Sequence, residues 1–184
     1  MKIFIQDMIK EFNEARTTPR SYITKIKSHM KYIKRFQGLT VYDNDDYPKV
    51  ILNKGDSAFT ECIKVLDKHR SIPELKYNED IAVKVPDKVD EMNNKEKLAE
   101  SILAKRNEIR DRYTGLSFHY DNSYLDAEVS ALLQIVDDTN TNSKRRNNIL
   151  SLYHEYIGVS IGKNTINGRY MIYITFAKGI SNDS

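Results

Sequence analysis

The sequence predicts an α/β protein, and two observations support this fold class. Near the C-terminus, two apolar and β-branched runs, Ile157–Gly162 and Tyr170–Ala177, flank the dipeptide Asn167-Gly168. Asn-Gly between such runs is a strong hairpin signal, because both central residues of a type I′ turn need φ > 0. Upstream, apolar residues recur at i, i+3 and i+4 over several segments, which is the pattern of amphipathic helices. We therefore expect helices packed on a small, mainly antiparallel sheet.

The N-terminal part is expected to hold two helices. The first has an apolar stripe and is expected to end near Arg16. Thr18 is then expected to cap the second helix, with Pro19 at its first position, and the apolar spacing continues to Ile33. Residues 37–55 are expected to form a solvated loop. The acidic run in this loop could hold calcium, but it lacks the glycine and the terminal glutamate of an EF-hand.

Further helices alternate with one strand in the middle of the chain. Asp56 is expected to cap a helix on which Cys62 is a buried apolar thiol. Pro86 is expected to bend or end the next helix, whose apolar face runs from Ile81 to Met92, because proline removes a backbone hydrogen bond. The remaining pattern predicts a helix over 98–113, a strand over 116–120 and a last long helix over 126–136.

Composition indicates one soluble domain spanning residues 1–184. Apolar residues make up 40% of the chain and charged residues 30%. A net charge of +3 is too small for a typical nucleic-acid-binding domain, so no nucleic-acid partner is expected. The single cysteine excludes an intramolecular disulfide. Residues 1–7 lack the apolar core of a signal peptide, which fits either a cytoplasmic protein or a mature chain without its targeting segment.

Several short patterns together resemble the CAP domain family, which groups cysteine-rich secretory proteins, antigen 5 and pathogenesis-related proteins. Two aspartates end a predicted helix, a polar loop leads to an Arg-x-Asn-Ile-Leu pattern, and an Ile-Gly-Val strand follows. An Asn-x-x-Arg-x-x-Pro pattern opens the chain, and a Pro-x-Leu pattern lies between them. The residues that carry the resemblance are Asn13, Arg16, Pro19, Pro73, Leu75, Asp137, Asp138, Arg146, Asn148, Ile149, Leu150, Ile157, Gly158 and Val159.

The resemblance implies a three-layer α/β/α sandwich and a bacterial type without disulfides. Similar single-domain members occur as outer-surface lipoproteins of spirochaete-type bacteria. An extracellular or outer-surface location follows from this likeness, with tethering to the membrane through a lipid anchor upstream of residue 1.

In the CAP family, two histidines and two glutamates form a metal-binding tetrad in a central cleft. Here Arg145 stands at the position of one histidine, and a guanidinium cannot ligate a metal. Residues 118–120 contain no glutamate, and residues 88–110 contain no histidine. The tetrad is therefore expected to be lost, with no metal or other cofactor bound and no catalytic residue. The ligand-binding candidates in the cleft are His119, Glu128, Arg145 and Arg146.

The resulting functional hypothesis is a non-enzymatic binding module for a lipid or sterol, or for a host protein. Arg145 and Arg146 could then hold an anionic head group. The alternative is a hydrolase or metal-dependent enzyme that uses a remodelled cleft around His119 and Glu128. Arg145 is expected either to enter the cleft and pair with Glu128 or to remain solvated. The other histidines are expected to lie on the surface (His29, His69) or to make a structural hydrogen bond (His154).

Overall fold

A computed structural model of the chain describes residues 2–46, 48–84, 88–89, 91–123, 126–139, 142–164 and 170–180. The helices are α1 (Lys2–Thr17), α2 (Pro19–His29), α3 (Asp56–Lys68), α4 (Glu91–Ile109), α5 (Ala127–Val136) and α6 (Lys144–Ile149), with 3-10 turns η1 (Met30–Tyr32) and η2 (Glu79–Ile81). The strands are β1 (Ile33–Phe36), β2 (Leu39–Tyr42), β3 (Val50–Ile51), β4 (Lys76–Tyr77), β5 (Lys88–Val89), β6 (Tyr113–Ser123), β7 (Tyr156–Asn164) and β8 (Tyr170–Ile180).

The larger sheet has the strand order β4-β7-β8-β6, and β5 also pairs with β7. Strands β7 and β8 form the predicted hairpin, with Ile157 opposite Phe176 and Gly162 opposite Met171. Strand β6 is antiparallel to β8, whereas the two short strands β4 and β5 are parallel to β7. The mainly antiparallel sheet is thus confirmed. The Asn167-Gly168 turn lies outside the described residues.

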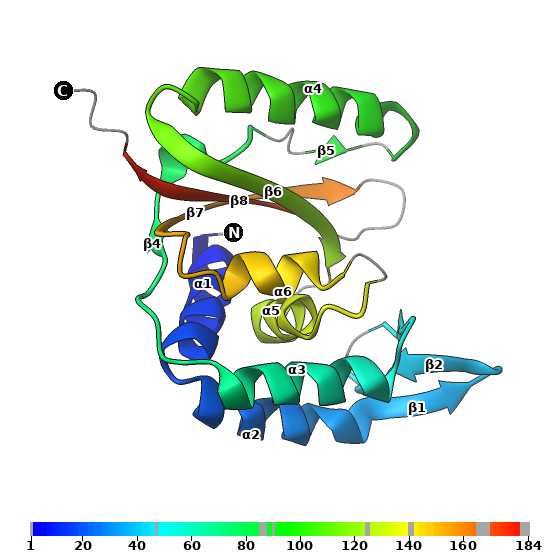
Figure 1. The fold of residues 1–184 in the computed structure, drawn as a ribbon. Coiled ribbons are helices and arrows are strands. Elements are labelled where there is room, and N and C mark those ends of the chain that lie inside the picture. Colours follow the sequence, from blue (N-terminus) through cyan, green and yellow to red (C-terminus); the bar gives the residue numbers. More distant parts are fainter. Residues whose placement is uncertain are drawn as a thin grey trace.

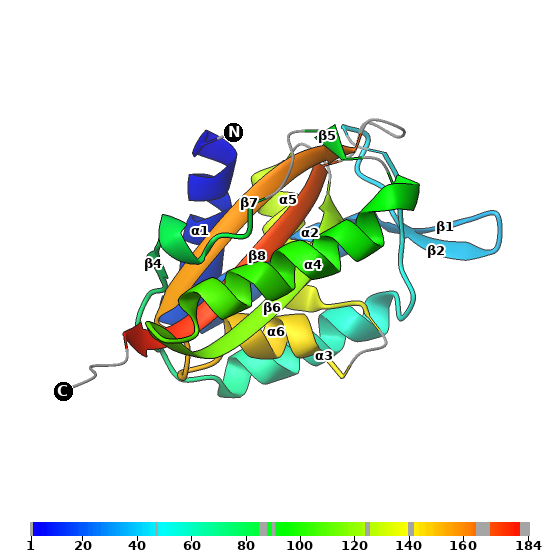
Figure 2. The same cartoon turned by 90° about the horizontal axis from the view of Figure 1, so that it is seen from above.

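Helices cover both faces of this sheet (Figure 1). Helix α4 lies on one face, and α1, α5 and α6 lie on the other, as the second view also shows (Figure 2). Helices α2 and α3 pack against each other and, in turn, against α1 and α5. The chain therefore has the predicted α/β fold with a three-layer order. None of the described helices is long and apolar enough to cross a membrane.

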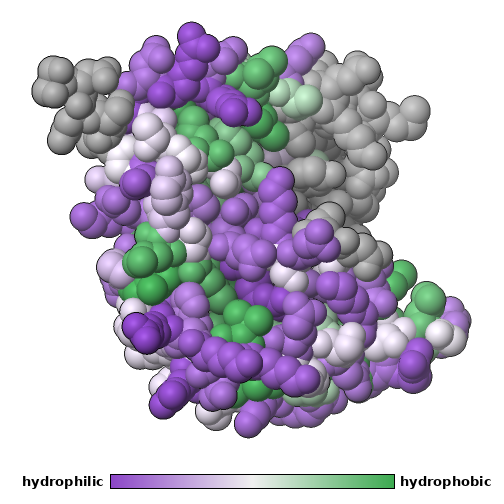
Figure 3. Space-filling view, viewed as in Figure 1, coloured by the Kyte–Doolittle hydropathy of each residue, from purple (hydrophilic) through white to green (hydrophobic). Residues whose placement is uncertain are grey.

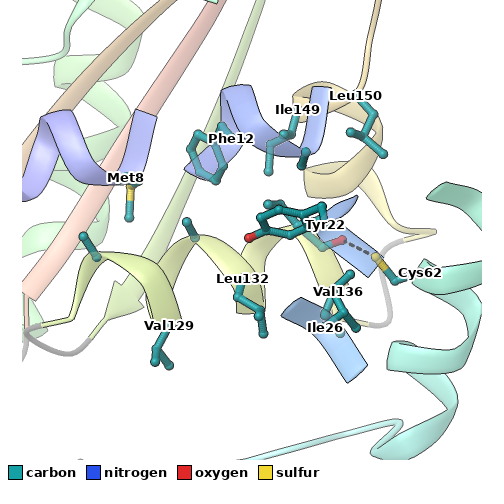
Figure 4. Packing of buried hydrophobic residues seen from close by; sticks show 14 of the residues in the cluster. Met8, Phe12, Tyr22, Ile26, Cys62, Val129, Leu132, Val136, Ile149 and Leu150 are labelled. Carbon is teal, nitrogen blue, oxygen red and sulfur yellow. Dashed lines mark hydrogen bonds between the residues drawn. The ribbon is translucent and has the colours of Figure 1, made fainter. Parts of the chain in front are cut away.

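Helix α5 is the centre of the main core (Figure 4). Eight of its ten residues are buried, since apolar side chains occur all round the helix. Asp126 caps it, because its carboxylate accepts the backbone N–H of Val129 at 2.7 Å. Cys62 of α3 is fully buried against α5 and donates its thiol to the carbonyl of Ile135 at 3.4 Å. Burial raises the pKa of Cys62 to about 11, as expected for an inert core thiol.

Two residues of the opening pattern, Asn13 and Arg16, tie α1 to distant segments. The carboxamide of Asn13 donates to the carbonyl of Leu75 at 3.1 Å and accepts its N–H at 2.8 Å. The guanidinium of Arg16, only 1% exposed, donates to backbone carbonyls alone. Its acceptors are Pro73 at 2.8 Å, Ile149 at 2.6 Å, Ser151 at 2.9 Å and His154 at 3.0 Å. These bonds join the segments that contain the Asn-x-x-Arg, Pro-x-Leu and Asn-Ile-Leu patterns.

The structure differs from the sequence prediction in the N-terminal part. Helix α2 ends at His29, and Ile33, predicted to lie on this helix, begins strand β1. Strands β2 and β3 fall within residues 37–55, where a solvated loop was predicted, and the three strands form a second sheet with the order β1-β2-β3. Gln37 and Gly38 both have positive φ and make the tight turn of its hairpin. Thr18 does not cap α2, because its hydroxyl donates backwards to the carbonyl of Glu14. Likewise, Asp56 is the first helical residue of α3 and Gly55 precedes it.

The helix predicted from Ile81 to Met92 is also wrong. Ile81 ends the turn η2, which Asn78 caps, and residues 88–89 form β5 before α4 begins. The position of Pro86 lies outside the described residues. The chain after η2 runs so close to β7 that a Cβ atom on Gly158 would lie 2.7 Å from the backbone nitrogen of Ala82. Such a close approach requires glycine at this position.

Candidate functional site

The residues predicted to line a cleft are distributed over β6, α5 and the start of α6. His119 is placed in the middle of β6, opposite Ile174 of β8, on the sheet face that packs against α5. Its Nε2 donates to Oε1 of Gln134 on α5 at 2.9 Å, and its ring lies 5.4 Å from the ring of Phe176. His119 is therefore held in place by one neutral hydrogen bond and an aromatic contact.

The surroundings of His119 keep its imidazole neutral. Burial lowers the pKa of His119 to about 4, and the charges of Arg145 and Lys144 act in the same direction. The hydrogen bond to Gln134 and the negative charge of Asp137 oppose this shift but do not outweigh burial. At neutral pH the side chain is thus an uncharged hydrogen-bonding group.

In this arrangement His119 and Gln134 each keep one polar atom that makes no hydrogen bond to the described residues. With Nε2 as donor, the lone pair of His119 Nδ1 and the N–H groups of Gln134 Nε2 remain. Both atoms are buried and have no hydrogen-bond partner in the described part of the chain. Buried polar groups without partners are rare and concentrate at functional sites or at unfilled water positions. The interior between β6 and α5 therefore holds an unused acceptor next to an unused donor.

Glu128 does not join His119. It lies six residues before Gln134 on α5, which places the two side chains on different sides of the helix. Its carboxylate accepts the Nε2 proton of His29 at 3.3 Å, and Nδ1 of His29 lies 2.6 Å from the hydroxyl of Tyr42. Glu128 thus links α5 to the end of α2 and to β2. His29, predicted to be a surface residue, belongs to this partly buried cluster.

The two arginines occupy different positions. Arg146 is buried, with 2% exposure, and its guanidinium donates to the carbonyl of Val136 at 2.9 Å, to the hydroxyl of Ser143 and to the carboxylate of Glu61. It is therefore a structural group between α3, α5 and α6 and cannot reach an external head group. Arg145 is partly exposed, and its positive charge acts to lower the pKa of His119.

The Asp-Asp pattern shapes the loop that carries these arginines. Asp137 ends α5 in the left-handed conformation. Its carboxylate accepts the backbone N–H groups of Arg145 at 2.7 Å and Arg146 at 3.2 Å, which fixes the start of α6. The carboxylate of Asp138 accepts the N–H groups of Asn53 and of Lys54, the latter at 2.7 Å. Both aspartates therefore have structural roles.

Two further histidines have identifiable surroundings. His154 makes the structural hydrogen bond that was predicted: its Nδ1 donates to the carbonyl of Asn148 at 2.9 Å. Its ring also stacks on Phe176, at 5.2 Å, on which His119 packs as well. His69 is partly buried, and its Nε2 has no partner among the described residues. Burial and, to a smaller extent, the charge of Arg16 lower the pKa of His69.

Sequence reasoning missed Gln134, the direct partner of His119. Gln134 is fully buried in a helix whose other residues are mostly apolar, and this was the signal that could have found it. The carboxamide of Gln134 is uncharged, so it does not raise the basicity of the imidazole as a carboxylate partner does. No group of three His, Cys, Asp or Glu side chains that could hold a metal occurs within the described residues.

Comparison of the chain with family models, with curated proteins and with solved structures gives no match.

Proposed function

We propose that this chain is a non-enzymatic binding module, a CAP-type domain whose metal cleft has become a neutral recognition site. The observation that carries the proposal is the pair formed by His119 and Gln134. General acid–base catalysis needs a group whose pKa lies near the working pH, and the pKa of His119 is about 4. The pair can donate and accept hydrogen bonds but is poorly suited to move a proton at neutral pH.

The rival function, a hydrolase or metal-dependent enzyme, would need His119 and Glu128 at one centre. The two side chains have different partners, since Glu128 pairs with His29. Arg145 also places a positive charge near His119, which disfavours a bound cation. These contacts support the binding module over the enzyme.

The partner that the surface favours is a protein. Leu152 and Tyr153 follow α6 and are 70% and 51% exposed, and apolar side chains gather over this connector (Figure 3). The amine of Lys178 lies 4.5 Å from the centre of the Tyr153 ring. Exposed apolar groups beside tyrosine are typical of protein interfaces. Strand β6 next to them pairs only with β8 among the described strands, so its other edge can accept an extended segment.

A location outside the cytoplasm, tethered by a lipid anchor, belongs to the same proposal and is supported by the CAP resemblance. On this basis the partner is an extracellular protein, whereas a lipid or sterol is the second ligand class to be tested.

Zinc titration by calorimetry tests whether the cleft is non-enzymatic. We expect no one-to-one zinc binding that requires His119, so the wild type and His119→Ala should give the same heat of titration. One-to-one binding in the micromolar range that disappears in His119→Ala would contradict the proposal and favour the metal enzyme.

Binding to an immobilised panel of purified extracellular-matrix and serum proteins, fatty acids and sterol-containing vesicles tests the partner class. Leu152→Ser should weaken binding to a protein of the panel. Val65→Ser is the matched control, because Val65 is also a partly exposed apolar residue, at 37%, but lies on α3. Binding to the lipid samples alone would contradict the choice of a protein partner.

A further inference from the structure

A separate open pocket of about 690 Å3 lies between the start of α2 and the end of α3. Its walls include Arg20 and Ser21 of the first turn of α2 and the segment from Asp67 to Ser71. Neither segment belongs to β6, α5 or α6, which surround His119. The volume is within the range of pockets that hold small ligands.

The pocket carries an excess of positive charge. Arg20, Lys68 and Arg70 line it, against one carboxylate, that of Asp67. Within the described part of the chain, none of these three cations has an ion-pair partner. Elsewhere the chain does pair its cations, as Lys25 does with Glu11 and Glu14. Three unpaired cations on one concave surface favour an anionic ligand.

The backbone and a histidine add uncharged hydrogen-bonding groups. The hydroxyl of Thr18 points back to Glu14 and Pro19 has no N–H, so the amides of Arg20 and Ser21 at the start of α2 have no acceptor within the described residues. These amides and the helix dipole favour a negative group at this end of the 11-residue helix. His69 also lines the pocket, and its buried Nε2 has no hydrogen-bond partner among the described residues.

We propose that this pocket binds the phosphate group of a small phosphorylated ligand. Phosphate oxygens can accept hydrogen bonds from the two free backbone amides of α2. They can also accept charge-assisted hydrogen bonds from Arg20 and Arg70, and Lys68 adds a positive charge. The pocket is larger than phosphate alone, so room remains for the organic part of a phosphomonoester. This site is additional to the protein-binding role proposed for the surface at Leu152 and Tyr153 and does not depend on it.

An NMR titration of 15N-labelled protein with inorganic phosphate, glucose 6-phosphate and glucose tests the proposal. We expect saturable shifts of the Arg20 and Ser21 amides with both phosphates, tighter binding of the ester, and no shift with glucose. Sedimentation with vesicles that contain phosphatidic acid distinguishes a lipid head group from a soluble ester. Vesicle binding without binding of glucose 6-phosphate would overturn the assignment to a soluble ligand.

The double variant Arg20→Gln/Arg70→Gln should bind glucose 6-phosphate about ten-fold more weakly or worse, because two charge-assisted bonds are lost. The control Lys10→Gln/Lys27→Gln removes the same net charge from exposed positions of α1 and α2 outside the pocket and should change the affinity less than about two-fold. Both pairs of side chains are exposed, so both variants should fold, which thermal melting checks. Shifts that grow without saturation, or equal losses in the two variants, would overturn the proposal.

Discussion

The imidazole of His119 and the carboxamide of Gln134 lie 2.9 Å apart between β6 and α5. Because neither side chain is charged at neutral pH, the bond holds the ring in place without making it basic. The same spacing with a carboxylate at position 134 would favour a charged pair, so the protonation of His119 depends strongly on the residue at this position.

The first prediction is that His119 makes the fold less stable in mild acid. The pKa of His119 is about 4 in the folded chain, against about 6.5 in the unfolded one. Between these values only the unfolded chain binds the proton, so stability is complete above about pH 6.5 and falls as the pH drops toward 4. The loss should reach about 3 kcal/mol.

Urea unfolding at several pH values checks this, with His119→Gln as the comparison. The variant should lose less stability between pH 6.5 and 4 than the wild type does. His69 and His154 also have lowered pKa values and contribute a remaining slope of the same sign. Parallel curves for the two proteins would show that His119 titrates normally.

The second prediction is that Gln134→Glu raises the pKa of His119. A carboxylate at 2.9 Å would stabilise the imidazolium, and such pairs shift pKa values by about 1–3 units. NMR titration of the His119 ring protons measures the shift directly. Gln134→Met, which fills the same space without a charge, is the control and should not raise the pKa.

The third prediction separates three adjacent basic residues. Arg146→Ala should destabilise the fold by about 2–4 kcal/mol, because it removes a buried side chain and leaves the carbonyl of Val136 without its donor. Lys144→Ala should change stability by less than about 0.5 kcal/mol, since Lys144 is exposed. Thermal melts of these two variants and of Arg145→Ala rank the three variants by their loss of stability. A larger loss for Arg145→Ala than for Arg146→Ala would contradict the assignment of roles.

The sequence predicts best where a local pattern decides the structure. The β7–β8 hairpin follows from two alternating runs, and α5 follows from its apolar content and the cap at Asp126. Prediction from the sequence fails where tertiary contacts override the local pattern. The spacing from Ile81 to Met92 is helical, yet η2 is pinned against β7 at Gly158, and the chain forms a strand before α4.

The candidate site shows the same limit. Arg146 is buried and Arg145 is partly exposed, and a pattern of adjacent arginines cannot tell which side chain points inward. That choice depends on Asp137, whose carboxylate fixes the start of α6, and on Glu61 of a distant helix. Glu128 was predicted on the correct helix, α5. The sequence could not show that its side chain points toward His29 of α2, because this depends on how the two helices pack.

The fourth prediction concerns the close approach at Gly158. Gly158→Ala should destabilise the fold by about 1–3 kcal/mol, because the added Cβ would lie 2.7 Å from the backbone nitrogen of Ala82, and backbone cannot move aside cheaply. Gly179→Ala is the control in β8, where the nearest atom is a carboxylate oxygen of Glu155 at 3.7 Å. Chemical unfolding should therefore show a loss for the first variant only. Equal stability of both variants would mean that η2 can move away from the sheet.

The last prediction is that the guanidinium of Arg16 cannot be replaced by an amine. Arg16 donates to four carbonyls from two separate segments, and burial lowers its pKa to about 10, so it remains charged at neutral pH. Arg16→Ala should lower the free energy of unfolding by about 3 kcal/mol or more. Lysine has one side-chain nitrogen and cannot reach the acceptors of both segments, so Arg16→Lys should show a large part of the same loss. Denaturant unfolding measures both losses, and Arg20→Lys at the exposed start of α2 is the control. Full stability in Arg16→Lys would show that charge alone, rather than the forked geometry, holds these segments together.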